Sequence, residues 1–159
     1  MPVKQADLDA IDWKILKTLQ INGRITNVDL AEIVGISAPP CLRRVKKLED
    51  SGIIKGYRAL LNAPALGQSL VAFCFIGLHR QSDADLKTFA ARCTSWPLVR
   101  QAWTIQGEAD YLLHCVAPDL VSFQDFVIDG LTGAENVDTV RTALTIRQVK
   151  DEGPVVMGV

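Results

Sequence analysis

The chain has 159 residues, of which 48% are hydrophobic and 22% charged. Such a composition is typical of a soluble globular protein and is enough to bury one core of ordinary size or two small ones. It excludes a membrane helix, because no apolar run approaches the roughly 20 residues that such a helix needs, and the N-terminal segment lacks the apolar centre of a signal peptide. We therefore expect a cytoplasmic protein without a membrane partner.

The formal net charge of −1 is distributed unevenly. Up to Asn62 the chain has ten Lys and Arg against seven Asp and Glu, a balance of +3; from Ala63 onward it has seven against eleven, a balance of −4. A surface that binds nucleic acid concentrates cations, because they neutralise phosphates. The first part of the chain is therefore the part expected to contact DNA.

The first predicted element is a helix over about residues 9–20. Apolar residues recur there at three- and four-residue intervals, which places them on one face: Leu8, Ile11, Ile15 and Leu19. An aspartate in the first turn favours the start of the helix, and Asn22-Gly23 ends it. This helix is expected to cover the next two and to complete a three-helix core.

Two shorter helices joined by a tight turn are predicted within residues 27–46, NVDLAEIVGISAPPCLRRVK. In the first of them Asn27 is the expected cap, and the apolar face is expected to hold Val28, Leu30, Ala31 and Val34. Gly35 then breaks the helix, because glycine adopts a left-handed conformation without steric cost. This pattern predicts the turn of a helix-turn-helix.

The second helix of the pair carries cations on the face that its apolar residues do not use. Its buried stripe is predicted to contain Leu42, Val45 and Leu48, helped by Cys41. At about 100° per residue the opposite face and its flanks take the basic residues Arg43, Arg44, Lys46 and Lys47. A basic pair alone is usually a solvated face, but the preceding helix, turn and glycine favour contact with a DNA groove or with phosphates.

The start of this helix has two alternatives. If Ser37 is the N-cap, Pro39 and Pro40 occupy the second and third helical positions and have no N–H to donate to the serine oxygen. If Ala38 is the boundary, Pro39 takes the favoured first helical position. In both cases the prolines stiffen the end of the helix that would approach DNA.

The next segment, residues 53–62, has the β-branched and aromatic character of a strand, and the prolines and glycines after it mark a domain boundary. We divide the chain into a helix-turn-helix domain over residues 1–52, a linker strand and hinge over 53–67, a ligand-binding and oligomerisation domain over 68–150, and a tail over 151–159 that we expect to be mobile.

Strand and helix patterns alternate in the second domain. Strands are predicted over residues 69–78, 98–105, 111–117 and 137–149, and helices over 82–93 and 118–132. The order βαββαβ predicts an antiparallel sheet with two helices on one face, the ferredoxin-like arrangement. The predicted fold class is therefore α+β.

Residues with potential for chemistry are few. The four cysteines are far apart in sequence, lie among apolar residues and form no CxxC pair: Cys41, Cys74, Cys93 and Cys115. We interpret them as buried thiols rather than metal ligands or disulfides. No metal, cofactor or enzyme activity is expected, because His79 and His114 lie in separate strands and the sequence has no P-loop, GxGxxG or GxSxG motif.

Three segments carry a family resemblance: LDAIDWKILKTLQINGRITNVDLAEIVGIS from Leu8, RVKKLEDSGIIKGYRALLN from Arg44, and QGEADYLL from Gln106. In this order, over about residues 8–150, the chain resembles the Lrp/AsnC family of transcriptional regulators, the feast/famine proteins. The resemblance implies a winged helix-turn-helix, a linker strand and an effector-binding domain that dimerises through its sheet and often assembles further, commonly to octamers. It also implies association with the nucleoid.

The recognition helix of that family maps onto residues 37–50. Arginine suits bidentate recognition of guanine and lysine suits phosphate, and which residue reads a base stays open. The predicted DNA-binding residues are Asn27, Ser37, Pro39, Pro40, Arg43, Arg44, Lys46 and Lys47.

A glycine-and-aspartate turn of the family, which helps form an amino-acid pocket between dimers, maps onto Gly107 and Asp110. Backbone amides at a glycine can hold a carboxylate and an aspartate can hold an α-ammonium, although without the resemblance an ordinary hairpin turn would be favoured. The ligand's identity stays open, because Thr145 stands where an aliphatic residue is common. The predicted effector residues are Thr104, Gln106, Gly107, Glu108, Asp110, Leu120, Ala143, Leu144 and Thr145.

The predicted function is a sequence-specific transcriptional regulator that binds double-stranded DNA as a homo-oligomer and responds to an amino acid bound between dimers. Two alternatives stay open. One is a ligand-independent, nucleoid-organising DNA-binding protein, which an affinity change on adding amino acids would exclude. The other is a small-molecule sensor that uses the second domain only, against which the basic helix argues.

Overall fold

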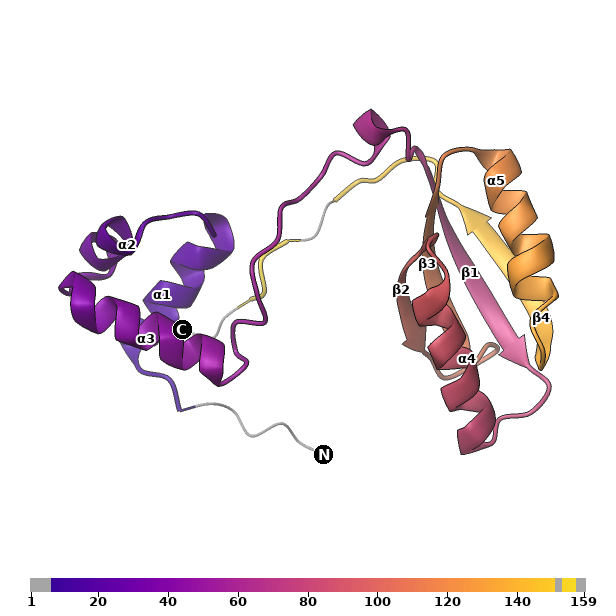
Figure 1. The fold of residues 1–159 in the computed structure, drawn as a ribbon, viewed down its shortest axis with the longest axis horizontal. Coiled ribbons are helices and arrows are strands. Elements are labelled where there is room, and N and C mark those ends of the chain that lie inside the picture. The colour runs from indigo at the N-terminus through magenta and orange to yellow at the C-terminus, as the bar shows by residue number, and fades with distance from the viewer. Residues whose placement is uncertain (1–6, 151–152, 157–159) are drawn as a thin grey trace. The chain divides into compact units, whose positions relative to one another are not determined.

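The computed structural model describes residues 7–150 and 153–156, and the chain divides into two compact units. The first unit comprises residues 1–60 with 150–159, and the second comprises residues 61–149. Figure 1 shows helices in the first unit and a sheet with covering helices in the second. The predicted α+β class is confirmed.

The first unit contains α1 (Ala10–Ile21), α2 (Asn27–Val34) and α3 (Ala38–Asp50), and its described residues form no strand. The side chains of Asp9 and Asp12 exchange reciprocal bonds with each other's backbone at the start of α1, which satisfies amides that a helix start leaves free. Gly35, with φ of 80°, ends α2. The predicted helix-turn-helix and three-helix core are confirmed, the core being Ile15, Leu16, Leu30, Ala31, Val34, Cys41 and Leu48.

Three local predictions in this unit are wrong. Thr26, not Asn27, caps α2, since its hydroxyl oxygen accepts from the backbone N–H of Asp29 at 3.2 Å. Val28 is 65% exposed and Leu42 is 57% exposed, although helical spacing assigns both to buried faces. Spacing alone does not say where the buried stripe of a helix ends. The buried stripe of α3 is centred on Cys41 and Leu48, and Leu42 lies outside that stripe.

The start of α3 follows the first of the two alternatives. Ser37 is the N-cap and makes no capping bond with its side chain. Pro39 and Pro40 supply no N–H at the positions that would donate to it, and the N–H of Cys41 is bonded to the Ser37 carbonyl at 3.2 Å. The helix end is therefore stiff but uncapped.

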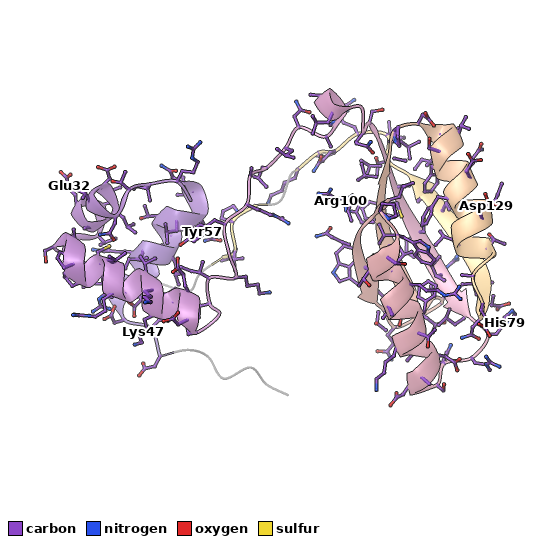
Figure 2. The ribbon with its side chains drawn as sticks, in the orientation of Figure 1. Glu32, Lys47, Tyr57, His79, Arg100 and Asp129 are labelled. Carbon is purple, nitrogen blue, oxygen red and sulfur yellow. The ribbon has the colours of Figure 1, made fainter. Side chains whose placement is uncertain are left out.

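The predicted linker strand over residues 53–62 is not formed. A strand needs a continuous hydrogen-bonded ladder, and all four strands of the sheet lie in the second unit. The linker packs instead through Tyr57, whose hydroxyl donates to Glu49 of α3 at 3.0 Å, and Figure 2 shows this ring beside the helices. A single 3₁₀ turn, η1 (Pro64–Leu66), follows it.

Of the tail predicted to be mobile, residues 151–152 and 157–159 lie outside the described residues. In its described part, Val155 bonds to Gln20 of α1. Its N–H donates to Gln20 Oε1 at 2.6 Å, and Gln20 Nε2 donates to its carbonyl at 3.4 Å. This part of the tail therefore belongs to the first unit.

The second unit has the order β1 (Leu70–Leu78), α4 (Asp83–Ser95), β2 (Val99–Thr104), β3 (Tyr111–Ala117), α5 (Leu120–Asp125), the π-helical turn η2 (Phe126–Thr132) and β4 (Val137–Leu144). The strands form an antiparallel sheet in the order β2-β3-β1-β4. The predicted βαββαβ arrangement is confirmed, although β4 ends at Leu144 rather than at residue 149.

Alternate residues of β1 and β3 are buried, because one face of the sheet packs against α4, α5 and η2. Phe89 of α4 and Phe123 of α5 complete this core. All four cysteines are buried and free, which confirms the interpretation as buried thiols, and Cys74 and Cys115 bring their sulfurs to 3.8 Å. Among the described residues no helix is long and apolar enough to cross a membrane.

Candidate functional site

The outer face of α3 carries three exposed cations, Arg43, Lys46 and Lys47. They project to solvent because Cys41 and Leu48 take the buried side of the helix. Lys47 lies on the outer side of α3 in Figure 2. The arrangement presents flexible positive charges from one rigid helix, which is the geometry needed to meet phosphates along a groove.

Arg44 is placed differently from the other three cations. Its Nη1 donates to Asp9 Oδ2 and to Asp12 Oδ1, each at 2.7 Å, and the Asp12 side chain is only 7% exposed. These bonds, first to Asp12 and then to Asp9, raise the pKa of Arg44 above its usual value. Backbone bonds at the helix start and the Arg44 guanidinium hold the pKa of Asp9 below its usual value. Arg44 thus joins α3 to α1.

The remaining residues predicted for DNA contact lie at the junction of α2 and α3. Ser37 and Pro39 are exposed, and Pro40 is half-buried. Asn27 is half-buried and its Nδ2 donates to the carbonyl of Ala38 at 2.9 Å, which ties the starts of the two helices together. The cations of α3 share a shallow concavity with four carboxylates, which limits the positive field there: Asp7, Asp9, Asp12 and Asp50.

The predicted effector turn lies between β2 and β3. Gly107 has φ of 135°, a conformation that glycine adopts and other residues avoid, and a Cβ there would meet nothing within 4 Å. Its backbone is therefore open to an approaching group. Thr104, Gln106 and Glu108 are exposed around it, and Glu108 pairs with Arg141 at 2.9 Å.

Asp110 bonds this turn to β1. Its Oδ2 accepts from the backbone N–H of Leu78 at 2.7 Å, and its own N–H donates to the carbonyl of Ile76 at 2.8 Å. The residue therefore fastens the turn to the end of β1. The sequence pattern gave no sign of this contact, because its partners lie more than thirty residues earlier.

The other predicted effector residues lie at the opposite end of the sheet. Leu120 begins α5 and is 46% exposed, and Leu144 ends β4 and is 49% exposed. Ala143 is exposed beside it, and Thr145 bonds to the carbonyl of Val71 through both its N–H and its hydroxyl, each at 3.0 Å. Leu120 and Leu144 thus each expose apolar surface at this end of the sheet.

Within one chain the two parts of the predicted effector site do not meet. The turn is bonded to Ile76 and Leu78, whereas Thr145 is bonded to Val71, near the other end of β1. Val71 and Leu78 are seven positions apart along an extended strand, which corresponds to about 23 Å. A single amino acid is too small to touch both ends.

Sequence reasoning missed two residues that pair with predicted site residues, one in each unit. Asp12 reads from sequence only as a first-turn carboxylate, and no local signal reveals its pairing with Arg44, 32 positions later. Nothing in the sequence pattern singles out Arg141, although its guanidinium pairs with Glu108 and lies 5.9 Å from the ring of Phe75. Among the described residues no group of three or more His, Cys, Asp or Glu could hold a metal ion.

A helix-turn-helix with cations on its second helix, followed by a separate α+β unit with an open glycine turn, defines a two-domain DNA-binding regulator. The winged helix-turn-helix DNA-binding family matches residues 8–55, and the Lrp/AsnC ligand binding domain matches residues 71–155. A leucine-responsive regulatory protein of Rhizobium meliloti is 72% identical over 149 residues, covering 94% of this chain and 96% of that protein. The chain belongs to the Lrp/AsnC family of transcriptional regulators.

Two solved structures share the fold over nearly the whole chain. A transcriptional regulator of Neisseria meningitidis in complex with L-Met has a TM-score of 0.88 and 39% identity, covering 94% of this chain and 96% of that one. An AsnC family transcriptional regulator from Agrobacterium tumefaciens has a TM-score of 0.86 and 30% identity, covering 95% of this chain and 97% of that one. The family is one of regulators and not of enzymes.

Proposed function

We propose that this protein regulates transcription by placing α3 in the major groove of double-stranded DNA, and that an amino acid changes its affinity for that DNA. One observation carries the DNA-binding part: Arg43, Lys46 and Lys47 are exposed together on the helix that follows the turn. Neutralised phosphates release counterions, and this supplies affinity. Arg44 is not among the proposed contacts, because Asp9 and Asp12 hold it.

The proposed effector is an apolar amino acid. A relative is named for leucine, and a similar structure was solved with L-Met. In this chain the open backbone at Gly107 would hold the carboxylate, and the Asp110 oxygen that does not accept from Leu78 would hold the ammonium. Leu120 and Leu144 would meet the side chain, so that burial of apolar surface adds to the polar contacts.

The pocket would be shared between copies of the chain. The turn and the leucine end lie about 23 Å apart along β1, so one ligand meets both only if the second part comes from another copy. We propose a homodimer that assembles further, an octamer being the form we expect, in the cytoplasm and on the nucleoid. No cofactor is needed, because backbone and side-chain groups supply every proposed contact.

The test is fluorescence anisotropy of the protein on DNA from upstream of its own gene, with excess competitor DNA, across a salt series. Binding that survives competitor and weakens steeply with salt is expected. Adding L-leucine or L-methionine should change the affinity, since a ligand that prefers one assembly shifts the equilibrium. Specific binding that no amino acid changes would contradict the effector part and favour a nucleoid-organising protein; absence of specific binding would contradict the whole proposal.

A further inference from the structure

Leu42 is an exposed apolar residue at the edge of the cationic face of α3, beyond Lys46. It is 57% exposed, whereas Leu48, six residues later on the same helix, is buried. At about 100° per residue Leu42 lies about 60° from Pro39 and about 40° from Lys46 around the helix. Its neighbours around the helix are therefore an exposed proline and an exposed cation, and the exposed Glu49 lies two turns further along, about 20° away.

The orientation of this face is fixed from the other side of the helix. Arg44 points about 160° away from Leu42, and its two 2.7 Å bonds to Asp9 and Asp12 join α3 to α1. Rotation of α3 that buried Leu42 would have to break these bonds. Leu42 consequently stays on the surface that carries Arg43 and Lys46.

A single exposed leucine usually needs no explanation, but this one lies where charge complementarity identifies the occupant of the face. The cations on one side of it suit the phosphates on one rim of a groove, and the leucine beside them would then face the base edges. In the major groove only thymine presents a methyl group, and apolar side chains contact it. An arginine or lysine at this position would instead favour guanine.

We propose that Leu42 contacts the C5 methyl group of a thymine and thereby makes the protein prefer a T·A pair at one position of each half-site. This inference rests on the proposed DNA-binding function and specifies what the recognition helix reads. Leu42 adds sequence preference through apolar contact, and Arg43 and Lys46 add affinity through phosphates. The three residues thus divide recognition between them.

The experiment replaces the thymines of the bound site by deoxyuridine, one at a time. The site is first defined by footprinting on the upstream DNA. Uracil keeps the base pair and lacks only the methyl group. Deoxyuridine at one position should therefore weaken DNA binding by the wild type about fourfold, the change expected for loss of one buried methyl group. Leu42→Ala should bind the thymine site more weakly and lose this sensitivity, and Leu42→Met should keep part of it.

The control variant is Ile33→Ala. Ile33 is 59% exposed on α2, so the change removes a similar exposed apolar side chain from the same unit. It should keep the full deoxyuridine penalty. Circular dichroism and sedimentation should be unchanged in all the variants.

Three results would overturn the inference. They are a wild type that is indifferent to deoxyuridine at every position, a Leu42→Ala variant with the same penalty as the wild type, and a Leu42→Ala variant with an altered oligomeric state, which would make Leu42 a contact between copies. A wild type that binds no DNA above competitor would instead overturn the proposed function itself. The two failures are therefore distinguishable.

Discussion

The two units of this chain form their proposed sites in opposite ways. In the first unit a single helix, α3, presents Arg43, Lys46 and Lys47 together, so one chain holds a complete contact surface. In the second unit the proposed ligand residues lie at the two ends of the sheet, about 23 Å apart along β1. In the proposed function, DNA contact is thus a property of one copy, whereas ligand contact would require two.

If both proposed sites are correct, this difference would couple the two activities. A ligand that binds only when copies are correctly arranged must favour that arrangement by the free energy of binding. Each copy brings its own recognition helix, so the arrangement also sets how the helices are spaced on DNA. The proposed shared pocket would therefore be a means of control as well as a binding site.

The sharpest test of a shared pocket is complementation between two defective copies. Gly107→Val strains the turn, because valine disfavours φ of 135°, and Leu144→Asp places a charge at the apolar end. Each variant alone should lose the amino-acid response of DNA affinity completely. Mixed oligomers formed at equal amounts should regain about a quarter of intact pockets, since each pocket draws its two parts from different copies at random.

A mixture that regains nothing would indicate that the pocket is not shared between copies. Gly107 is preferred to Asp110 for this test. Asp110 also accepts from the backbone N–H of Leu78, so its loss would disturb the end of β1 as well as the pocket.

Next in size is the effect of removing Asp12, which holds the helices of the first unit together. Asp12→Ala deletes the buried partner of Arg44 and one bond at the start of α1. The free energy of unfolding of this unit should fall by about 2 kcal/mol, and its Tm by roughly 10 °C. Thermal unfolding followed by circular dichroism measures this.

Asp50→Ala serves as the matched control for that loss. Asp50 is exposed at the last residue of α3, where a negative charge is unfavourable to the helix, so its removal should not lower the Tm. Equal stability of Asp12→Ala and the wild type would mean that the ion pairs with Arg44 do not hold α3 in place.

A smaller effect should separate the two arginines of α3. Arg43→Ala should weaken DNA binding and lower the slope of log affinity against log salt by about 1, since one phosphate contact is lost. Arg44→Gln should lower stability but keep the slope. Anisotropy titrations over a salt series measure this, and a reduced slope for Arg44→Gln would make Arg44 a phosphate contact after all.

The smallest predicted effect concerns pH and the uncovered face of the sheet. Burial, and then the positive charge of Arg100, lower the pKa of His114 below 6.5, and its ring stacks on Phe73 at 5.2 Å. Near this pH the unfolded chain then binds more protons than the folded chain. The free energy of unfolding of the second unit should therefore have its full value above pH 6.5 and decline as pH falls through that value. His114→Gln should flatten this decline while matching the wild type at about pH 8, and urea unfolding at several pH values tests it.

The sequence was sufficient to predict those features of the fold that a single helix, strand or turn determines. The helices, the Gly35 turn and the βαββαβ order follow from local spacing and turn chemistry, and the structure confirms them. The exposed cations of α3 could be assigned to a face because they share one helix. Family resemblance located the glycine turn, which residue patterns alone would have left as an ordinary hairpin.

Sequence reasoning failed where distant parts of the chain meet. Periodicity places Leu42 and Val28 inside, because it gives a face but not how deeply a helix is seated. It groups Arg44 with the surface cations, because the partners of Arg44 lie on another helix. The linker strand is predicted from composition, and composition does not say whether a partner strand is present.

The two prolines at the start of α3 have a consequence for the water that must be removed when DNA binds. A helix normally begins with several N–H groups that only solvent satisfies, and stripping that solvent is costly. Here Pro39 and Pro40 have no N–H, and the N–H of Cys41 is already bonded to Ser37. The tip of the helix can therefore enter a narrow, partly dehydrated space at a lower cost than a helix that begins with three free amides, and it leaves the charged contacts to the side chains further along.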